Sequence, residues 1–214
     1  MSRHHRPRQT TLCALCLLLL LALFVPAEAT AGRTHLVQPG DRLHGRWVTE
    51  MESLREYLSS VLQPVKANCH NVTGPMTYAF VAKGDPRMFT MAVSTSSTQV
   101  LLNRQRSGGR WDTIAFEMNF SHVIPMTLTA GNIIELTNTA VATTVDGYTV
   151  NDVFLGSMEL SVTPAGMAWS ASRMRYDFLD DNTVRMTPIF PPAPDGVSIH
   201  PRPFILKRVS SNPD

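Results

Sequence analysis

The segment 113–120, TIAFEMNF, alternates between small or polar residues and large apolar ones. Successive side chains of a β-strand point to opposite faces, so this spacing places Ile114, Phe116, Met118 and Phe120 together on one face. The opposite face is polar. The segment therefore predicts a half-buried strand in a protein built from antiparallel β-structure.

The same alternation recurs along the chain after residue 75. Its repeats lie at residues 78–80, 89–93, 124–128, 158–162 and 174–178, with shorter ones at 184–186 and 204–206. Turn sequences separate them at residues 84–86, 107–109, 130–132, 146–147, 164–166 and 180–182. We expect about nine or ten short strands in an antiparallel meander, forming either a closed barrel or a two-sheet sandwich.

One N-terminal amphipathic helix is predicted over residues 49–63, because its apolar residues recur at helical spacing. Thr49 or Ser53 supplies the N-cap, and Pro64 ends the run. We expect an extended segment over residues 32–48, a single β-rich domain over 49–209 and a disordered tail over 210–214.

A proline-rich loop is predicted over residues 188–203, which hold six of the chain's 15 prolines. Proline cannot donate to a sheet ladder, so the segment should be extended. It is either a crossover covering one end of the β-structure or a loop that docks a partner through Phe190 and Ile199.

Residues 1–31 have the pattern of a secretory signal peptide. A basic start leads into an apolar run over 12–25, and small residues occupy the cleavage positions at 27–31. A membrane span needs about 20 residues, so the run is too short for one. We expect a mature chain beginning at Thr30 or Gly32, located outside the cell, in a periplasm or in the secretory-pathway lumen, with no membrane span after cleavage.

The charges and cysteines narrow the class of protein further. Cleavage after residue 31 reduces 19 basic and 17 acidic residues to 16 of each, and this balance argues against a nucleic-acid partner. Cys69 is the only cysteine left after cleavage, so no internal disulfide can form. Its thiol is either buried and inert or available for an intermolecular bridge.

No residue pattern supports catalysis, a cofactor or a metal. Cys69 and His70 are adjacent but do not make a metal site by themselves, and the acidic segment 177–182 lacks the spacing of a calcium loop. Two Asn-x-Ser/Thr sequons, at Asn71 and Asn119, are expected to be accessible glycosylation sites. In a eukaryotic source we expect a glycan on at least Asn71, whereas in a bacterial periplasm both asparagines would be ordinary surface residues.

Methionine is unusually frequent, and many methionines fall on the expected inward faces. Flexible thioethers adapt to different apolar ligands, although they also fill ordinary cores. We expect the lining of an interior ligand site to consist of Phe80, Met91, Phe116, Met118, Met126, Met158 and Trp169.

The segment Leu43–Trp47 contains Gly45-x-Trp47 and resembles the Gly-x-Trp motif near the start of lipocalins. The resemblance implies an up-and-down barrel closed at one end by Trp47, with Arg173 or Arg185 packed on that tryptophan. The predicted helix after Trp47 departs from the family, as does the absence of a Thr-Asp-Tyr motif and of a C-terminal helix. A second Gly-x-Trp, at Gly109–Trp111, is the alternative counterpart.

Residues 35–43 also resemble the opening of a LysM module, which implies binding to a peptidoglycan-like polysaccharide.

Two functions remain open from the sequence. The first is an exported β-barrel that binds a small apolar or amphipathic ligand in its interior. The second is a non-catalytic interaction module or accessory subunit of a secretory-pathway or envelope assembly. The module would use a sheet face or the 188–203 loop to bind a protein partner.

Overall fold

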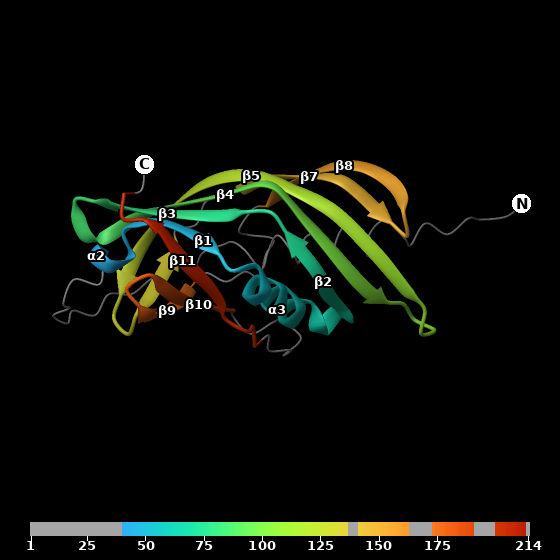
Figure 1. Cartoon of the computed structure of the whole chain (residues 1–214), viewed down its shortest axis with the longest axis horizontal. Helices are drawn as coiled ribbons and strands as arrows, with labels where there is room; N and C mark the ends of the chain where they lie inside the picture. The colour runs from blue at the N-terminus through green and yellow to red at the C-terminus, as the bar shows by residue number, and fades with distance from the viewer. Residues whose placement is uncertain (1–39, 137–140, 163–172, 191–199, 213–214) are drawn as a thin grey trace, which may run out of the picture.

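A computed structural model describes residues 40–136, 141–162, 173–190 and 200–212 (Figure 1). The expected signal peptide at 1–31, the turn at 164–166, Trp169 and Ile199 lie outside the described residues. The elements in chain order are α2 Gly40–Leu43, β1 Gly45–Thr49, α3 Met51–Leu62, the 3₁₀ helix η1 Gln63–Val65, β2 Ala67–Thr73, β3 Met76–Lys83, β4 Asp85–Gln105, β5 Trp111–Thr129, β6 Ile133–Leu136, β7 Val141–Val150, β8 Val153–Val162, β9 Arg173–Asp180, β10 Thr183–Ile189 and β11 Phe204–Ser210.

Eight strands close into an antiparallel barrel. Their order around the ring is β1-β3-β4-β5-β6-β9-β10-β11, and β11 pairs back with β1. The order follows the chain once the α3–β2 and β7–β8 segments are set aside, so the barrel is an up-and-down meander. This confirms the all-β fold class with one amphipathic helix, and the closed barrel is formed in preference to the sandwich.

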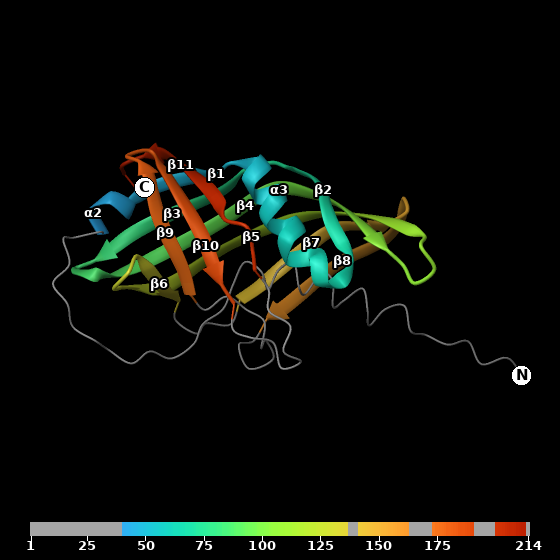
Figure 2. The same cartoon turned by 90° about the horizontal axis from the view of Figure 1, so that it is seen from below.

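Two barrel strands continue well beyond the ring (Figures 1 and 2). The far halves of β4 and β5 pair with each other and also with β2 and β7, and β8 completes an extension in the order β2-β4-β5-β7-β8. The prediction of separate strands near 114–120 and 124–128 was wrong, because one strand of 19 residues covers both. The buried apolar residues of this strand all take even positions, namely Ile114, Phe116, Met118, Ile124, Met126 and Leu128, so the same face is buried at both ends of the strand.

Another correction concerns the turn expected at 146–147. Gly147 lies inside β7, where the register with β8 shifts between Val145 and Tyr148. The chain reverses instead at Asn151 and Asp152, which have φ angles of 49° and 63°. Two consecutive positive φ angles suit a tight hairpin, and Asn and Asp tolerate them well.

Helix α3 packs on the inner face of β2 and reaches β11, as seen from below (Figure 2). Its buried face is the predicted apolar stripe, with Leu54, Tyr57 and Leu58 among its members. The predicted caps were wrong, because Thr49 ends β1 and the helix has no side-chain N-cap. The hydroxyl of Ser53 donates to the Glu50 carbonyl oxygen at 2.8 Å.

The ends of the expected domain also differ from the prediction. Residues 32–48 were expected to precede the β-structure, yet Gly45–Thr49 forms the first barrel strand. At the other end β11 continues through Ser210, and the Oγ of that serine accepts a hydrogen bond from the Asn212 amide at 3.0 Å.

Candidate functional site

The barrel interior is the first candidate site, and three of the predicted lining residues lie there. Phe80 of β3, Met91 of β4 and Met126 of β5 are each at most 1% exposed. Phe80 is the register partner of Met91, so their side chains share the inner face of adjacent strands. The opposite wall adds Met174, Tyr176 and Met186 from β9 and β10. The wall is therefore apolar and rich in methionine.

The remaining predicted lining residues are placed elsewhere. Phe116 and Met118 are buried, but they lie on the extension, where their register partners in β4 are Val100 and Thr98. Met158 belongs to β8, and its side chain lies outside the described residues, as does all of Trp169. Sequence alternation identified the inward face correctly but did not show where the barrel ends along β5.

Tyr176 is the distinctive polar residue of the interior, and sequence analysis missed its role. Its side chain is 1% exposed, and its Oη has no hydrogen-bond partner among the residues that the structure describes. The ring meets Phe178 edge-on, with centroids 5.9 Å apart. Burial raises the pKa of Tyr176 to about 12, which keeps the phenol neutral. A buried hydroxyl without a partner costs about 1–3 kcal/mol, so this atom is suited to a bound polar group.

The hydroxyl of Tyr78 differs from that of Tyr176. Tyr78 of β3 donates its hydroxyl hydrogen to the Met76 sulfur at 3.4 Å. Its ring stacks near Phe204, which also contacts Tyr57 of α3 at a centroid distance of 5.3 Å. Burial raises the pKa of both Tyr57 and Tyr78. These rings connect the helix to the barrel wall at the end where β1 leads into α3.

The start of β1 is closed around Trp47, whose register partner on β3 is Tyr78. The indole Nε1 donates to the Leu43 carbonyl oxygen at 2.9 Å, and the Arg208 guanidinium lies 4.2 Å from the ring centroid. Arg208 also donates to the carbonyl oxygens of Arg42, His44 and Asp181. One arginine therefore ties together α2, the start of β1 and the β9–β10 hairpin.

The prediction that Arg173 or Arg185 packs on Trp47 was wrong. Arg173 and Arg185 form ion pairs with Glu135 and Asp177, at 3.5 Å and 3.2 Å. Arg208 takes the position because β11 is the neighbour of β1 and is in register with Trp47. The alternative Gly109–Trp111 motif is excluded as a counterpart, because Trp111 is 58% exposed at the start of β5.

Position 45, the first residue of the Gly-x-Trp motif, requires a glycine because of its backbone conformation and its close neighbours. Its φ is +125°, and a Cβ at this position would lie 2.4 Å from the Ser210 carbonyl oxygen. The LysM-like segment ends in α2, whose Leu43 is fully buried in the same core as Trp47. Residues 35–39 of that segment lie outside the described residues.

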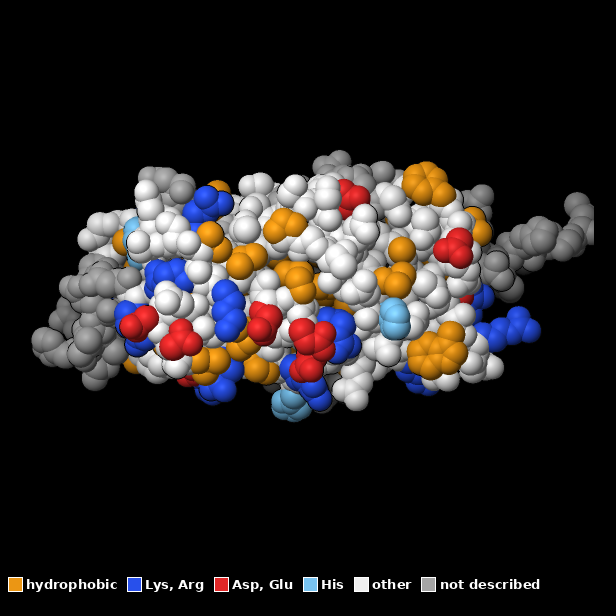
Figure 3. Space-filling model, viewed as in Figure 1, with side chains coloured by type: hydrophobic (Ala, Val, Ile, Leu, Met, Phe, Trp, Pro, Cys, Tyr) orange, Lys and Arg blue, Asp and Glu red, His pale blue; other side chains and the backbone are white. Residues whose placement is uncertain are grey.

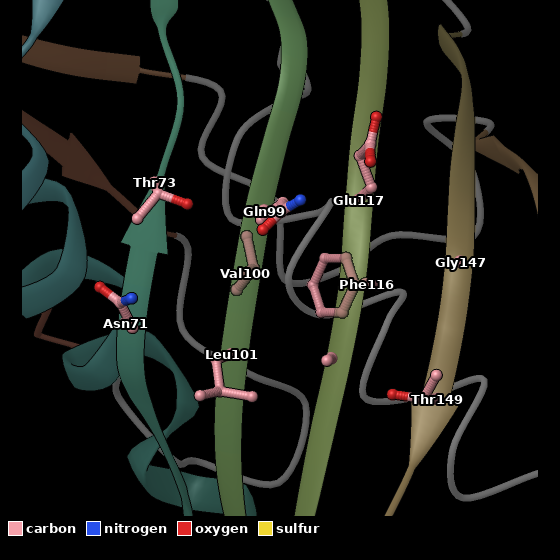
Figure 4. Close-up of a pocket in the computed structure, with 10 residues that line it drawn as sticks. Asn71, Thr73, Gln99, Val100, Leu101, Phe116, Glu117, Gly147 and Thr149 are labelled. Atoms are coloured by element: carbon pink, nitrogen blue, oxygen red, sulfur yellow. The ribbon is translucent and has the colours of Figure 1, made fainter. Parts of the chain in front are cut away.

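A second candidate site, the outer groove, lies on the outer face of the extension (Figure 4). It has a volume of about 350 Å³ and is lined by residues 71 and 73 of β2, 99–101 of β4, 115–117 of β5, and 147 and 149 of β7. Register shifts at Cys69/Asn71 and Ala115/Glu117 bend the strands here. Ala115 and Gly147 add little side-chain volume, so the face is hollowed rather than flat.

The two sequons lie on this face in different surroundings. Asn71 is exposed on β2, while Asn119 is half-buried on β5. The Nδ2 of Asn119 donates to Glu117 Oε1 at 3.0 Å, and its Oδ1 accepts from the Ser97 amide at 2.7 Å. The side-chain amide of Asn119 therefore bridges β4 and β5.

Both ends of the 188–203 segment contact the rest of the domain, at the core and at α3. Phe190 is half-buried and packs on the core, so it is not the exposed anchor that docking requires. Arg202 binds Glu56 of α3 through an ion pair of 2.9 Å, and its backbone amide donates to Ser60 Oγ at 2.8 Å. Residues 191–199, including Ile199, lie outside the described residues.

Cys69 is buried in β2, and burial raises its pKa to about 12, so the buried alternative is correct. Within the described ranges, no three His, Cys, Asp or Glu side chains gather to hold a metal ion. The same residues include no helix with the length and apolarity needed to cross a bilayer.

The chain matches no protein-family model, and comparison with curated proteins and with solved structures finds no match.

Proposed function

We propose that this protein is an exported, lipocalin-like carrier that binds one small apolar or amphipathic molecule inside its barrel. The observation that carries the proposal is the Tyr176 hydroxyl, which lies in a largely apolar, methionine-rich interior without a partner among the described residues. Ligand sites of this kind combine apolar walls with a few polar groups that orient the bound molecule. Methionine side chains let such a wall adapt to ligands of different shape.

The closed end supports the lipocalin-like part of the proposal. Gly45, Trp47 and Arg208 join the first and last strands of an eight-stranded up-and-down barrel, as the Gly-x-Trp resemblance implies. The α3–β2 and β7–β8 segments are additions to that plan. Export is supported by the signal-peptide pattern of residues 1–31, with the secretory lumen, a periplasm or the extracellular space as the destination.

The test uses delipidated protein and a fluorescent fatty acid, followed by native mass spectrometry. We expect one bound molecule per chain. Tyr176→Phe should weaken binding about threefold to tenfold, because a hydrogen bond contributes about 0.5–1.5 kcal/mol. Tyr78→Phe is the matched control, since the Tyr78 hydroxyl already has Met76 as a partner. Failure of the wild-type protein to take up the probe would contradict the carrier function.

A second candidate function, the interaction module, is favoured by exposed apolar side chains on the extension. Trp111, Val153, Phe154 and Leu155 are each 55–66% exposed near the β4–β5 and β7–β8 hairpins. Figure 3 shows hydrophobic side chains exposed at that end of the molecule. Cross-linking in the native host should capture a stoichiometric protein partner, and Phe154→Ser should abolish that capture if the module is correct.

A further inference from the structure

The outer groove contains both defining residues of one sequon. Asn71 and Thr73 lie on the outer face of β2, which is an edge strand of the extension. Asn71 is exposed, so a group attached to its Nδ2 meets the groove on one side and solvent on the other.

The chemistry of the lining suits a sugar. Thr73, Gln99, Glu117 and Thr149 present hydroxyl, amide and carboxylate groups across four neighbouring strands. These groups hydrogen-bond sugar hydroxyls and the acetamido group of N-acetylglucosamine. The half-buried Leu101 provides an apolar surface for the C–H face of a sugar ring.

The second sequon, at Asn119, is less accessible to an attached sugar than the first. Asn119 is half-buried in the middle of the sheet, and both ends of its amide are engaged, with Glu117 and with the Ser97 backbone. A sugar attached to Asn119 Nδ2 would replace one of the two hydrogens of the group that donates to Glu117. The Ser97 contact supports the register shift between Thr95 and Thr98, where Ser97 has a φ of 54°.

We propose that Asn71 carries an N-linked glycan whose first sugar occupies the outer groove, and that Asn119 remains unmodified. The inference rests on the export part of the proposed function and requires a eukaryotic secretory pathway. In the transfer, Asn71 Nδ2 bonds to C1 of the sugar and loses one proton. The bond between C1 and the pyrophosphate oxygen of a lipid-linked oligosaccharide donor breaks, and the lipid pyrophosphate leaves.

The first experiment expresses the full chain in eukaryotic secretory cells and measures glycan mass before and after enzymatic deglycosylation. We expect one glycan on the wild-type protein, none on Asn71→Gln and one on the matched control Asn119→Gln. A glycan that persists in Asn71→Gln, or is lost in Asn119→Gln, overturns the assignment.

Protease protection in microsomes separates this inference from export. A chain that enters the lumen but carries no glycan contradicts the inference alone. A chain that stays outside the lumen contradicts both export and the inference.

The second experiment tests whether the sugar occupies the groove. Peptide-N-glycosidase should release the glycan several-fold more slowly from folded than from denatured protein. Ala115→Phe fills the groove floor and should speed release from the folded state, whereas Val123→Phe, on the same strand outside the groove, should not. Equal release rates from folded and denatured wild-type protein would show that the glycan lies free in solvent.

Discussion

Single residues hold the closed end of the barrel together, and Gly45 is the clearest case. Its positive φ and its close approach to Ser210 explain why a glycine precedes Trp47 by two residues. Arg208 then supplies both the cation over the indole and the donors for three backbone carbonyls. Burial lowers the pKa of Arg208, but the group remains fully protonated at neutral pH.

Gly45→Ala should be strongly destabilising. Backbone strain alone costs about 1–3 kcal/mol, and the new Cβ also forces β1 away from β11. Gly131→Ala is the control, since its φ of +77° is also positive but nothing lies within 4 Å of its Cβ. Chemical denaturation of both variants measures the difference. Equal losses in the free energy of unfolding would show that the contact with Ser210 is unimportant.

Cys69 should be unreactive in the folded protein. Burial raises its pKa to about 12, so the thiolate that reacts with labelling reagents is scarce at pH 8 and is also shielded. A thiol reagent should label Cys69 only after unfolding, as followed by mass spectrometry. Rapid labelling of native protein would instead support an intermolecular bridge through this residue.

At the scale of elements, Asp112 joins the two hairpins of the extension. It is 4% exposed, forms an ion pair with Arg106 and accepts from Asn151 Nδ2 at 2.7 Å. The Asn151 backbone amide in turn donates to the Thr113 carbonyl oxygen at 2.8 Å. The hydrogen bond from Arg106 lowers the pKa of Asp112 despite the opposing effect of burial.

Asp112→Asn should loosen the β7–β8 hairpin and leave the barrel intact. The pKa of Asp112 is depressed below 3.8, so its carboxylate contributes stability at neutral pH, and this contribution is lost as the pH falls through the lowered pKa. Amide hydrogen exchange should accelerate around residues 148–154 in the variant. Asp152→Asn makes the same charge change on the exposed turn and should have little effect. Unchanged exchange in Asp112→Asn would contradict this role.

At the scale of the whole molecule, burial of phenols and of the thiol links stability to alkaline pH. Tyr57, Tyr78 and Tyr176 all have raised pKa values because they are buried. In the unfolded chain these groups ionise near the usual value of 10, while in the folded protein they stay protonated. The unfolded state therefore binds fewer protons above that pH.

The free energy of unfolding should be constant from neutral pH to about 8, should begin to fall near pH 9 as Cys69 of the unfolded chain ionises, and should fall more steeply from about 10 to about 12 as the tyrosines of the unfolded chain follow. Denaturant titrations at fixed pH measure the loss, and tyrosinate absorbance of the native protein should lag behind that of the unfolded chain. Tyr176→Phe should reduce the slope of the pH dependence. A native titration indistinguishable from the unfolded one would contradict the burial of these side chains.

The local features of the fold could be predicted from the sequence. Alternation marked the buried faces of β3, β4, β5, β9, β10 and β11, helical spacing identified α3, and glycine and aspartate marked the β3–β4, β4–β5, β5–β6 and β9–β10 turns. Alternation did not mark β1, β2, β6 or β7. The Gly45-x-Trp47 motif correctly indicated the closed end. These features succeed because they depend on neighbouring residues, whose spacing sets the direction of each side chain.

The contacts between distant residues could not be predicted, because they depend on which strands pair. Arg208 rather than Arg173 packs on Trp47 because β11 closes the ring beside β1, and no local pattern states which strands become neighbours. Phe116 and Phe80 carry the same apolar signal, yet one lies on the extension and the other in the barrel, because β5 changes partners along its length. The outer groove and the unpaired Tyr176 hydroxyl likewise arise from strand pairing, which brings together side chains far apart in the sequence.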